Sequence, residues 1–103
     1  MTVRRPIPGF PGYAATSAGS VLGPDGRRRR GTAHHGGHLR VELDRGRRAF
    51  VHWLVALAFH GPCPRGCTLV RHLDGNPRNN RPDNLRWGTP AENARDREQH
   101  RTR

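Results

Sequence analysis

The sequence predicts a small α+β fold in which antiparallel hairpins pack against two helices. The observations behind this prediction are short apolar–polar alternations between turn residues, and two segments with the spacing or the end signals of helices. At 103 residues the chain can form one compact domain but not two with separate cores. Only 32% of the residues are hydrophobic, and 13 Gly and 9 Pro favour a loop-rich fold over a helical bundle.

The N-terminal part predicts a loop followed by a short strand. Residues 6–13 place Pro and Gly around large apolar side chains, which predicts an ordered loop that anchors Phe10 and Tyr13 on the rest of the protein. Residues 20–23 predict a strand that ends in a turn. The basic run at residues 27–30 is compatible with either a return strand or a loop, and the sequence leaves both open.

A hairpin and a helix are predicted in the middle of the chain. Residues 38–43 alternate between apolar and polar side chains, as a half-buried strand requires. Residues 44–46 form a turn, and residues 47–51 return as the second strand. Apolar residues then recur at helical spacing from Val51 to Phe59, after which a Gly-Pro pair ends the helix.

The C-terminal part predicts two short strands and a capped helix. Residues 68–73 and 85–87 have the composition of strands and enclose a loop rich in Asn, Arg and Pro. Thr89 and Glu92 have the spacing of a capping box, in which each side chain bonds to the backbone N–H of the other residue. We therefore expect the last helix over residues 90–100.

The charge of the chain indicates a polyanionic partner. The formal net charge is +11, and all 19 basic residues are Arg. Arg binds phosphate oxygens in pairs and stacks on bases, so nucleic acid suits this composition better than a membrane surface does. A GC-rich coding sequence would explain why Lys is absent, but it would not explain the excess of positive charge.

Hydropathy and cysteine content predict a protein of a reducing compartment. No apolar run approaches the roughly 20 residues that span a membrane, and the N-terminus lacks a secretory apolar segment, so we expect a cytoplasmic protein without a membrane partner. Cys63 and Cys67 are too few for a disulfide framework and are expected to be thiols. Their spacing, with His52 and His60 nearby, is compatible with zinc, but a second matching pair is missing, so structural zinc is not favoured.

Other His residues have less specific signals. His34, His35 and His38 lie in a Gly-rich stretch, which favours a solvated loop. His52 opens the first predicted helix, where it could reach a phosphate or a metal ion or could simply pack.

Motifs in a fixed order carry a resemblance to a known family. The order is a His on a strand, a polar loop, an Asn before an apolar strand, and an Asn in the first turn of a capped helix. The residues in these places are Val51-His52-Trp53-Leu54-Val55-Ala56, Ala58-Phe59, His72-Leu73-Asp74-Gly75-Asn76, Asn79-Asn80-Arg81-Pro82-Asp83-Asn84-Leu85-Arg86-Trp87 and Glu92-Asn93. On these residues the chain from about residue 38 to residue 100 resembles the HNH (His-Asn-His) endonucleases of phages and mobile introns.

The resemblance implies two parts of the chain. Residues 38–103 would form the nuclease domain. Residues 7–13 and 19–21 are similar to a short module that often precedes such domains in homing endonucleases, although the usual Trp before the Ile is absent. This similarity implies an N-terminal DNA-binding module over residues 1–37, which must share the core with the rest.

The same resemblance implies a ββα-metal motif that holds one divalent cation, Mg²⁺ or Mn²⁺, and hydrolyses phosphodiester bonds in double-stranded DNA. His72 would be the general base that deprotonates the attacking water, Asn84 would hold the loop and orient His72, and Asn93 would be a metal ligand. A neutral imidazole can accept a proton at cellular pH, and an Asn carbonyl oxygen is a hard ligand suited to such a cation.

The sequence departs from the family pattern at Arg71, where members usually have an Asp or Asn that also binds the metal. Three interpretations remain open. The metal could be held by Asn93 with help from Asp74 or Asp96, the site could be weakened, or Arg71 could be a phosphate clamp beside the scissile bond. The second interpretation leads to an alternative function, a DNA-binding protein on an HNH scaffold that has lost efficient catalysis.

Further basic residues are expected to contact DNA phosphates. They are Arg27, Arg28, Arg29, Arg30, Arg78, Arg81 and Arg86. An RNA-binding module is not favoured, because no aromatic sheet motif for base stacking occurs.

Overall fold

A computed structural model describes residues 2–101, and the side chains of these residues except at position 35 and positions 97–101. The strands are β1 (Arg4–Pro6), β2 (Ala14–Thr16), β3 (Val21–Leu22), β4 (Thr32–Ala33), β5 (Leu39–Glu42), β6 (Arg48–Phe50), β7 (Leu69–His72) and β8 (Leu85–Gly88). The helices are α1 (Val51–His60) and α2 (Pro90–Arg101), and the 3-10 turns are η1 (His35–Gly37), η2 (Asp44–Gly46) and η3 (Pro82–Asn84). The predicted α+β class, with two helices and antiparallel hairpins, is confirmed.

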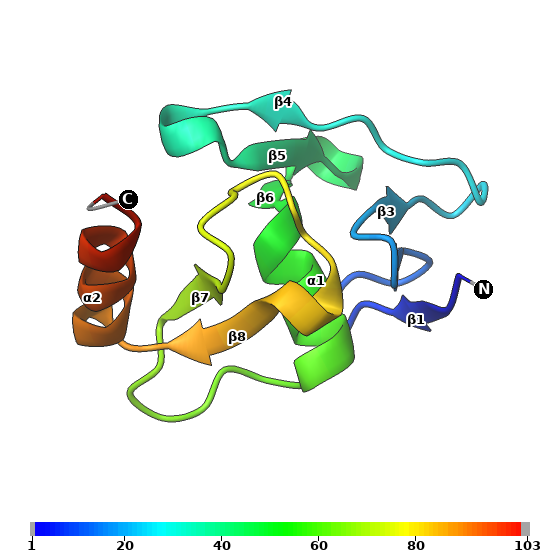
Figure 1. Cartoon of the computed structure of the whole chain (residues 1–103). Coiled ribbons are helices and arrows are strands. Elements are labelled where there is room, and N and C mark those ends of the chain that lie inside the picture. The colour runs from blue at the N-terminus through cyan, green and yellow to red at the C-terminus, as the bar shows by residue number, and fades with distance from the viewer. Residues whose placement is uncertain (1, 102–103) are drawn as a thin grey trace.

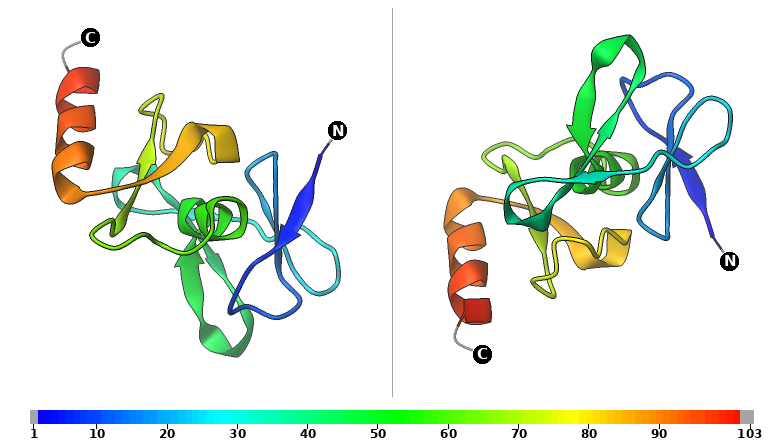
Figure 2. Two further views of the ribbon diagram at one scale, coloured as in Figure 1. Left: turned by 90° about the horizontal axis from the view of Figure 1, so that it is seen from below. Right: turned by 90° about the horizontal axis from the view of Figure 1, so that it is seen from above.

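The strands form three small antiparallel sheets, with strand orders β1-β2-β3, β4-β5-β6 and β7-β8. Figure 1 shows α1 in the middle of the molecule, with the sheets arranged around it and α2 beside β7. The two views of Figure 2 show α2 and the N-terminal sheet at opposite ends of the molecule, with α1 between them. Within residues 2–101, neither helix has the length and apolar character needed to cross a membrane.

One hydrophobic core surrounds α1. Leu54, Val55 and Ala56 of this helix are fully buried. Each of the three sheets contributes buried side chains to the same cluster, among them Ala15, Val21, Val41, Val70 and Leu85. Burying a side chain the size of Leu or Val stabilises the fold by about 1.5–3 kcal/mol, so α1 is the element on which all three sheets depend.

The N-terminal segment contacts both the middle hairpin and the loop after β7. Tyr13 is buried, and its hydroxyl accepts a hydrogen bond of 2.9 Å from the backbone N–H of Asp44. Gly19, at φ +86°, lies so close to the loop after β7 that a Cβ there would stand 2.6 Å from the carbonyl carbon of Asn80. Only a residue without a side chain can make this approach, so the N-terminal segment supports the position of Asn80.

The predicted middle hairpin is confirmed, and the alternative at the basic run is resolved. Val41 and Leu43 are buried as the alternation requires, and β5 pairs with β6. The basic run at residues 27–30 is a loop with one isolated bridge, between Leu22 and Arg28, rather than a strand. The Arg29 side chain folds back over the preceding turn, where its Nη1 lies 3.0 Å from Asp25 Oδ1.

The C-terminal hairpin and helix also follow their sequence signals. β7 and β8 pair with His72 opposite Leu85. The capping box of α2 is present, because the backbone N–H of Thr89 donates to Glu92 Oε1 at 3.0 Å and the backbone N–H of Glu92 donates to Thr89 Oγ1 at 3.1 Å.

Candidate active site

Three His rings meet at a cavity of about 390 Å³. His38 lies just before β5, His52 in the first turn of α1, and His72 at the end of β7. The ring centroids are 4.7 Å apart for His38 and His52, 5.1 Å for His52 and His72, and 5.3 Å for His38 and His72. The cavity is lined by Gly36, His38, His52, Leu69, Val70, His72, Gly75, Pro77, Asn93 and Asp96.

The strand alternation of β7 turns His72 inward. Val70 and His72 are buried while Leu69 and Arg71 are partly exposed, so one face of the strand is more buried than the other. The strand ends at His72, because the chain then turns and the N–H of Gly75 bonds to the His72 carbonyl at 2.9 Å. His72 is only 8% exposed, although it borders the cavity.

Asn80 is the side chain that contacts the His72 ring. Its Oδ1 lies 2.8 Å from His72 Nε2. An amide oxygen can only accept a hydrogen bond, so in this geometry Nε2 carries the proton and Nδ1 holds the lone pair. Asn80 is itself 2% exposed, and its backbone is the one that Gly19 approaches. The orientation of His72 is therefore fixed from the loop after β7 and, behind it, from the N-terminal segment.

Burial keeps all three imidazoles neutral. Burial, with smaller contributions from the neighbouring His72 and His38, lowers the pKa of His52 to about 3. Burial also lowers the pKa of His72, against a partial opposing effect of the Asn80 hydrogen bond, and it lowers the pKa of His38. A neutral His72 is a ring that can accept a proton at cellular pH.

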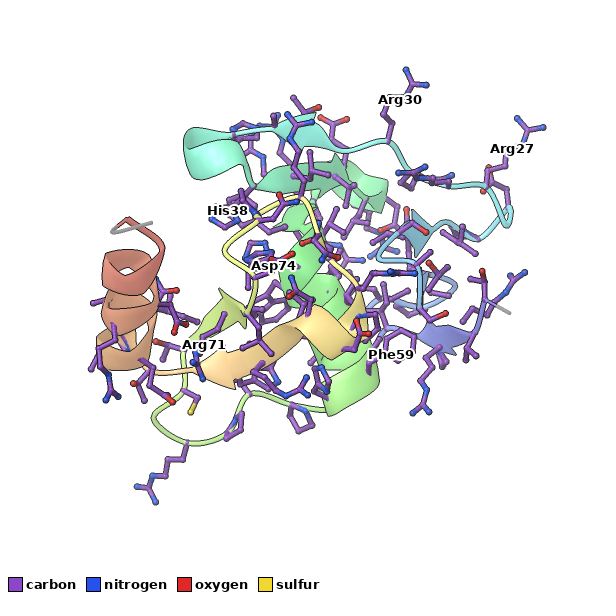
Figure 3. The ribbon with its side chains drawn as sticks, viewed as in Figure 1. Arg27, Arg30, His38, Phe59, Arg71 and Asp74 are labelled. Carbon is purple, nitrogen blue, oxygen red and sulfur yellow. The ribbon has the colours of Figure 1, made fainter. Side chains whose placement is uncertain are left out.

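Arg71 faces the opposite side of β7 and binds α2. Its Nε donates to Asp96 Oδ2 at 2.7 Å and its Nη2 donates to Asp96 Oδ1 at 3.0 Å, a bidentate pair. Its Nη1 stands 3.5 Å from Glu92 Oε2. Figure 3 shows Arg71 between the β7–β8 hairpin and α2. Because the Arg71 guanidinium is paired with two carboxylates, it does not present bare positive charge to a cation.

Asp74, in the turn after β7, and Asn84, the last residue of η3, are hydrogen-bonded to each other. The Asn84 Nδ2 donates to Asp74 Oδ1 at 2.9 Å and to the Asn79 carbonyl at 2.9 Å, and Asn84 Oδ1 accepts from the Asp74 N–H at 3.0 Å. Asp74 also accepts from Asn79 Nδ2 and from the N–H of Asn76. These hydrogen bonds, with that from Asn79 the strongest, hold the pKa of Asp74 below its usual range.

Comparisons with known proteins match this arrangement. A family model described as HNH endonuclease matches residues 49–95, the stretch from α1 to α2 that carries His52, His72 and Asn93. The chain belongs to the HNH endonuclease family. It is 31% identical over 94 residues to an uncharacterized HNH endonuclease of Acanthamoeba polyphaga mimivirus, L247, a match that covers 86% of this chain and 24% of that protein.

A solved structure of an HNH enzyme shares the fold. It describes DNA binding and cleavage by the HNH homing endonuclease I-HmuI, which is 30% identical to this chain. The two structures superpose with a TM-score of 0.81 over 98% of this chain and 60% of that chain. The chain thus spans about a quarter of the viral HNH relative and three fifths of the homing endonuclease.

Within the HNH fold, the residues singled out from the sequence separate into two groups. His72, Asn93 and Asp96 line the same cavity. Asp74, in the turn after His72, and Asn84, at the end of η3, are not among the lining residues. The expectation that Asp74 shares a strand face with His72 required the strand to continue, and β7 ends at His72.

The arginines expected to contact DNA lie mostly at the surface. Six of the seven are exposed, and Arg29 is partly buried; the exposed six are Arg27, Arg28, Arg30, Arg78, Arg81 and Arg86. Figure 3 shows Arg27 and Arg30 projecting away from the body of the molecule. Arg86 is partly engaged, since its Nη1 donates to its neighbour's carbonyl, that of Leu85, at 2.6 Å.

Sequence reasoning missed two residues of this HNH site. His38 was expected on a solvated loop, and that interpretation is wrong, because its ring is half-buried against His52 and His72. Asn80 was not assigned a role of its own, although it contacts His72. No local spacing could have revealed the His cluster, since its members come from three separate elements. Cys63 and Cys67 are not part of this cluster; the first is exposed and the second partly exposed.

Proposed function

We propose that the protein is a metal-dependent DNA endonuclease that hydrolyses a phosphodiester bond of double-stranded DNA with His72 as the general base. The observation that carries the proposal is the position of His72 at the cavity, with one ring nitrogen held by Asn80 and with Asn93 of α2 on the same wall. With Nε2 protonated, Nδ1 is the atom that takes the proton from the attacking water. The family match and the DNA-cleaving structural neighbour support the same conclusion.

The residues at the cavity fit a hard divalent cation. Asn93 offers a carbonyl oxygen and Asp96 a carboxylate, and both line the cavity. Each oxygen of Asp96 accepts one hydrogen bond from Arg71, which holds the carboxylate in place at the cavity. When bound, Mg²⁺ or Mn²⁺ would stabilise the charge that grows on the phosphate and the leaving oxygen.

Asp96 is a better candidate ligand than Asp74. Asp74 is engaged by Asn76, Asn79 and Asn84 in a turn and does not line the cavity. In this proposal the carboxylate that family members carry before the catalytic His comes instead from α2, and Arg71 is the positioning residue that fixes it.

DNA is the partner that the charge and the exposed arginines support. With a formal charge of +11, binding should weaken steeply with salt, because each neutralised phosphate contributes about −0.9 to the slope of log K against log salt. A mobility-shift titration of a duplex at several salt concentrations measures this slope. A slope near zero would mean that the Arg excess serves another purpose.

The decisive experiment is cleavage of supercoiled plasmid with Mg²⁺ or Mn²⁺, followed by the same reaction in EDTA. Nicked or linear product that disappears with the chelator supports the enzyme. Binding without cleavage under both cations would instead support a DNA-binding protein on an HNH scaffold, the alternative that Arg71 in place of a carboxylate keeps open.

A further inference from the structure

The three His rings at the cavity have the composition of a nitrogen-only metal site. One ring nitrogen of each of His38, His52 and His72 lies within 4.8 Å of the others. Two ligands of a tetrahedral ion with metal–nitrogen bonds of 2.0–2.1 Å stand about 3.3 Å apart, so small ring rotations bring all three within reach of one ion. The adjoining cavity leaves room for a fourth ligand such as water.

Unsatisfied nitrogen atoms indicate that the cluster lacks a ligand. The Nδ1 atoms of His38 and His52 are buried, and within the described part of the chain they have no hydrogen-bond partner. Buried polar atoms without partners are rare in folded proteins, because each one costs the desolvation of the group.

The third ring already has the outer contact that metal-bound His residues usually have. A His ligand commonly donates its other ring N–H to a carbonyl or carboxylate, which fixes the tautomer and the ring orientation. His72 makes this contact through Nε2 to Asn80 Oδ1 at 2.8 Å, which leaves Nδ1 for an ion.

We propose that His38, His52 and His72 bind one transition-metal ion of the Zn²⁺, Co²⁺ or Ni²⁺ class, at a site distinct from the oxygen ligands Asn93 and Asp96. Imidazole nitrogen suits these ions, whereas Mg²⁺ requires oxygen ligands and would not enter. Among the described residues, the cluster contains no carboxylate or thiolate, so its ligands are three neutral imidazoles and the ion keeps its full charge.

Binding at this site has a consequence for the proposed nuclease, and that consequence rests on the proposed function. An ion on His72 Nδ1 occupies the lone pair that would accept the proton of the attacking water. The transition metal is therefore an inhibitor of cleavage with Mg²⁺, and a chelator selective for it restores the reaction.

Binding is tested without any activity measurement, by calorimetric titration of the untagged, EDTA-treated and dialysed protein with Zn²⁺ and with Mg²⁺. We expect one Zn²⁺ per chain at a site that Mg²⁺ does not fill, and a rise of Tm by about 10 °C at a hundredfold excess of Zn²⁺ over Kd. His38→Gln and His52→Gln should each weaken Zn²⁺ binding by at least about tenfold, because a ligand is lost.

Two controls separate this site from other zinc ligands. His34→Gln changes a His outside the cluster and should leave the Zn²⁺ affinity unchanged. Cys63→Ser with Cys67→Ser removes the thiols and should also leave it unchanged. Equal affinity of His38→Gln and the unmodified chain, or loss of binding in the cysteine variant, would overturn the proposal.

A second experiment measures cleavage, by adding Zn²⁺ to a plasmid reaction that contains Mg²⁺. Inhibition that His38→Gln relieves supports competition for His72. Zinc binding by a protein that cleaves under no condition would leave the metal site standing and remove the proposed nuclease, so the two failures are distinguishable.

Discussion

The two faces of β7 place neighbouring residues in opposite environments. On one face His72 is 8% exposed, neutral, and surrounded by two other imidazoles and Asn80. On the other face Arg71 is charged, partly exposed, and engaged with Asp96 and Glu92. The helix α2 contributes to both environments, because Asn93 and Asp96 line the cavity of His72 while Asp96 also binds Arg71.

This difference explains how an Arg can stand beside the proposed catalytic His72. On a strand, successive side chains point to opposite faces, so Arg71 does not enter the cavity of His72. Its charge is balanced by two carboxylates from α2, and its effect on the site passes through the position of Asp96. The His72 face would supply the base, and the Arg71 face would position a carboxylate.

The largest expected effect is loss of the base on the inner face. His72→Ala should lower the cleavage rate by about 10²–10⁴, because the attacking water is no longer deprotonated. DNA binding measured by mobility shift should change little, since His72 is buried and offers little surface to a DNA backbone. His34→Ala is the matched control and should cleave normally. Full activity of His72→Ala would remove the assignment.

Arg71→Asp removes the ion pairs that Arg71 makes on the outer face of β7. This change removes the bidentate partner of Asp96 and sets three carboxylates side by side, so we expect a cleavage rate lower by about tenfold or more and a lower Tm. The prediction is tested by measuring the cleavage rates of Arg71→Asp and of the unmodified chain over a range of Mg²⁺ concentrations.

The control for this prediction is Arg48→Asp, an equal change of charge at an exposed pair with Glu42. It should leave the rate nearly unchanged. Higher activity of Arg71→Asp at every Mg²⁺ concentration would show instead that a carboxylate before His72 is the missing metal ligand, and the positioning role of Arg71 would be wrong.

The buried imidazoles also predict how stability depends on pH. The pKa of His52 is lowered to about 3 in the folded protein, while in the unfolded chain it is about 6.5. Below pH 6.5 the unfolded chain binds a proton at His52 that the folded chain does not bind. The contribution of His52 to the free energy of unfolding therefore falls by about 1.4 kcal/mol per pH unit toward pH 3 and is constant above pH 6.5.

Urea unfolding in EDTA at pH 7.5 and pH 5 should therefore show a loss of about 2 kcal/mol from His52 alone. His52→Gln should reduce the difference between the two pH values by the share that comes from His52, while His34→Gln should keep it. A pH dependence that is the same in His52→Gln and in the unmodified chain would mean that His52 takes up its proton in the folded protein at an ordinary pH.

Local signals in the sequence sufficed for much of the fold. The capping box of Thr89 and Glu92, the alternation around Val41, and the helical spacing from Val51 each depend on residues within one element, and each is confirmed. His72 and Asn93 followed from the family motif, and both line the cavity.

The contacts across the fold could not be predicted in this way. His38 and His52 lie on elements that local patterns describe correctly, but their approach to His72 depends on how three sheets pack around α1. The pairing of Arg71 with Asp96 spans 25 residues and depends on the angle at which α2 leaves its cap. Tertiary packing, rather than residue order, determines these contacts.

The smallest expected effect separates a positioning role of Asn80 from a purely structural one. Asn80→Asp keeps the size of the side chain and an oxygen facing His72 Nε2, but it adds a negative charge beside the ring. A carboxylate favours the imidazolium, so the pKa of His72 should rise, and a general base must be unprotonated to act. The acidic limb of kcat/KM against pH should therefore move to higher pH, so that the variant loses more activity at acidic pH than at alkaline pH. A uniform loss at all pH values, with the limb unmoved, would mean that Asn80 merely supports the loop.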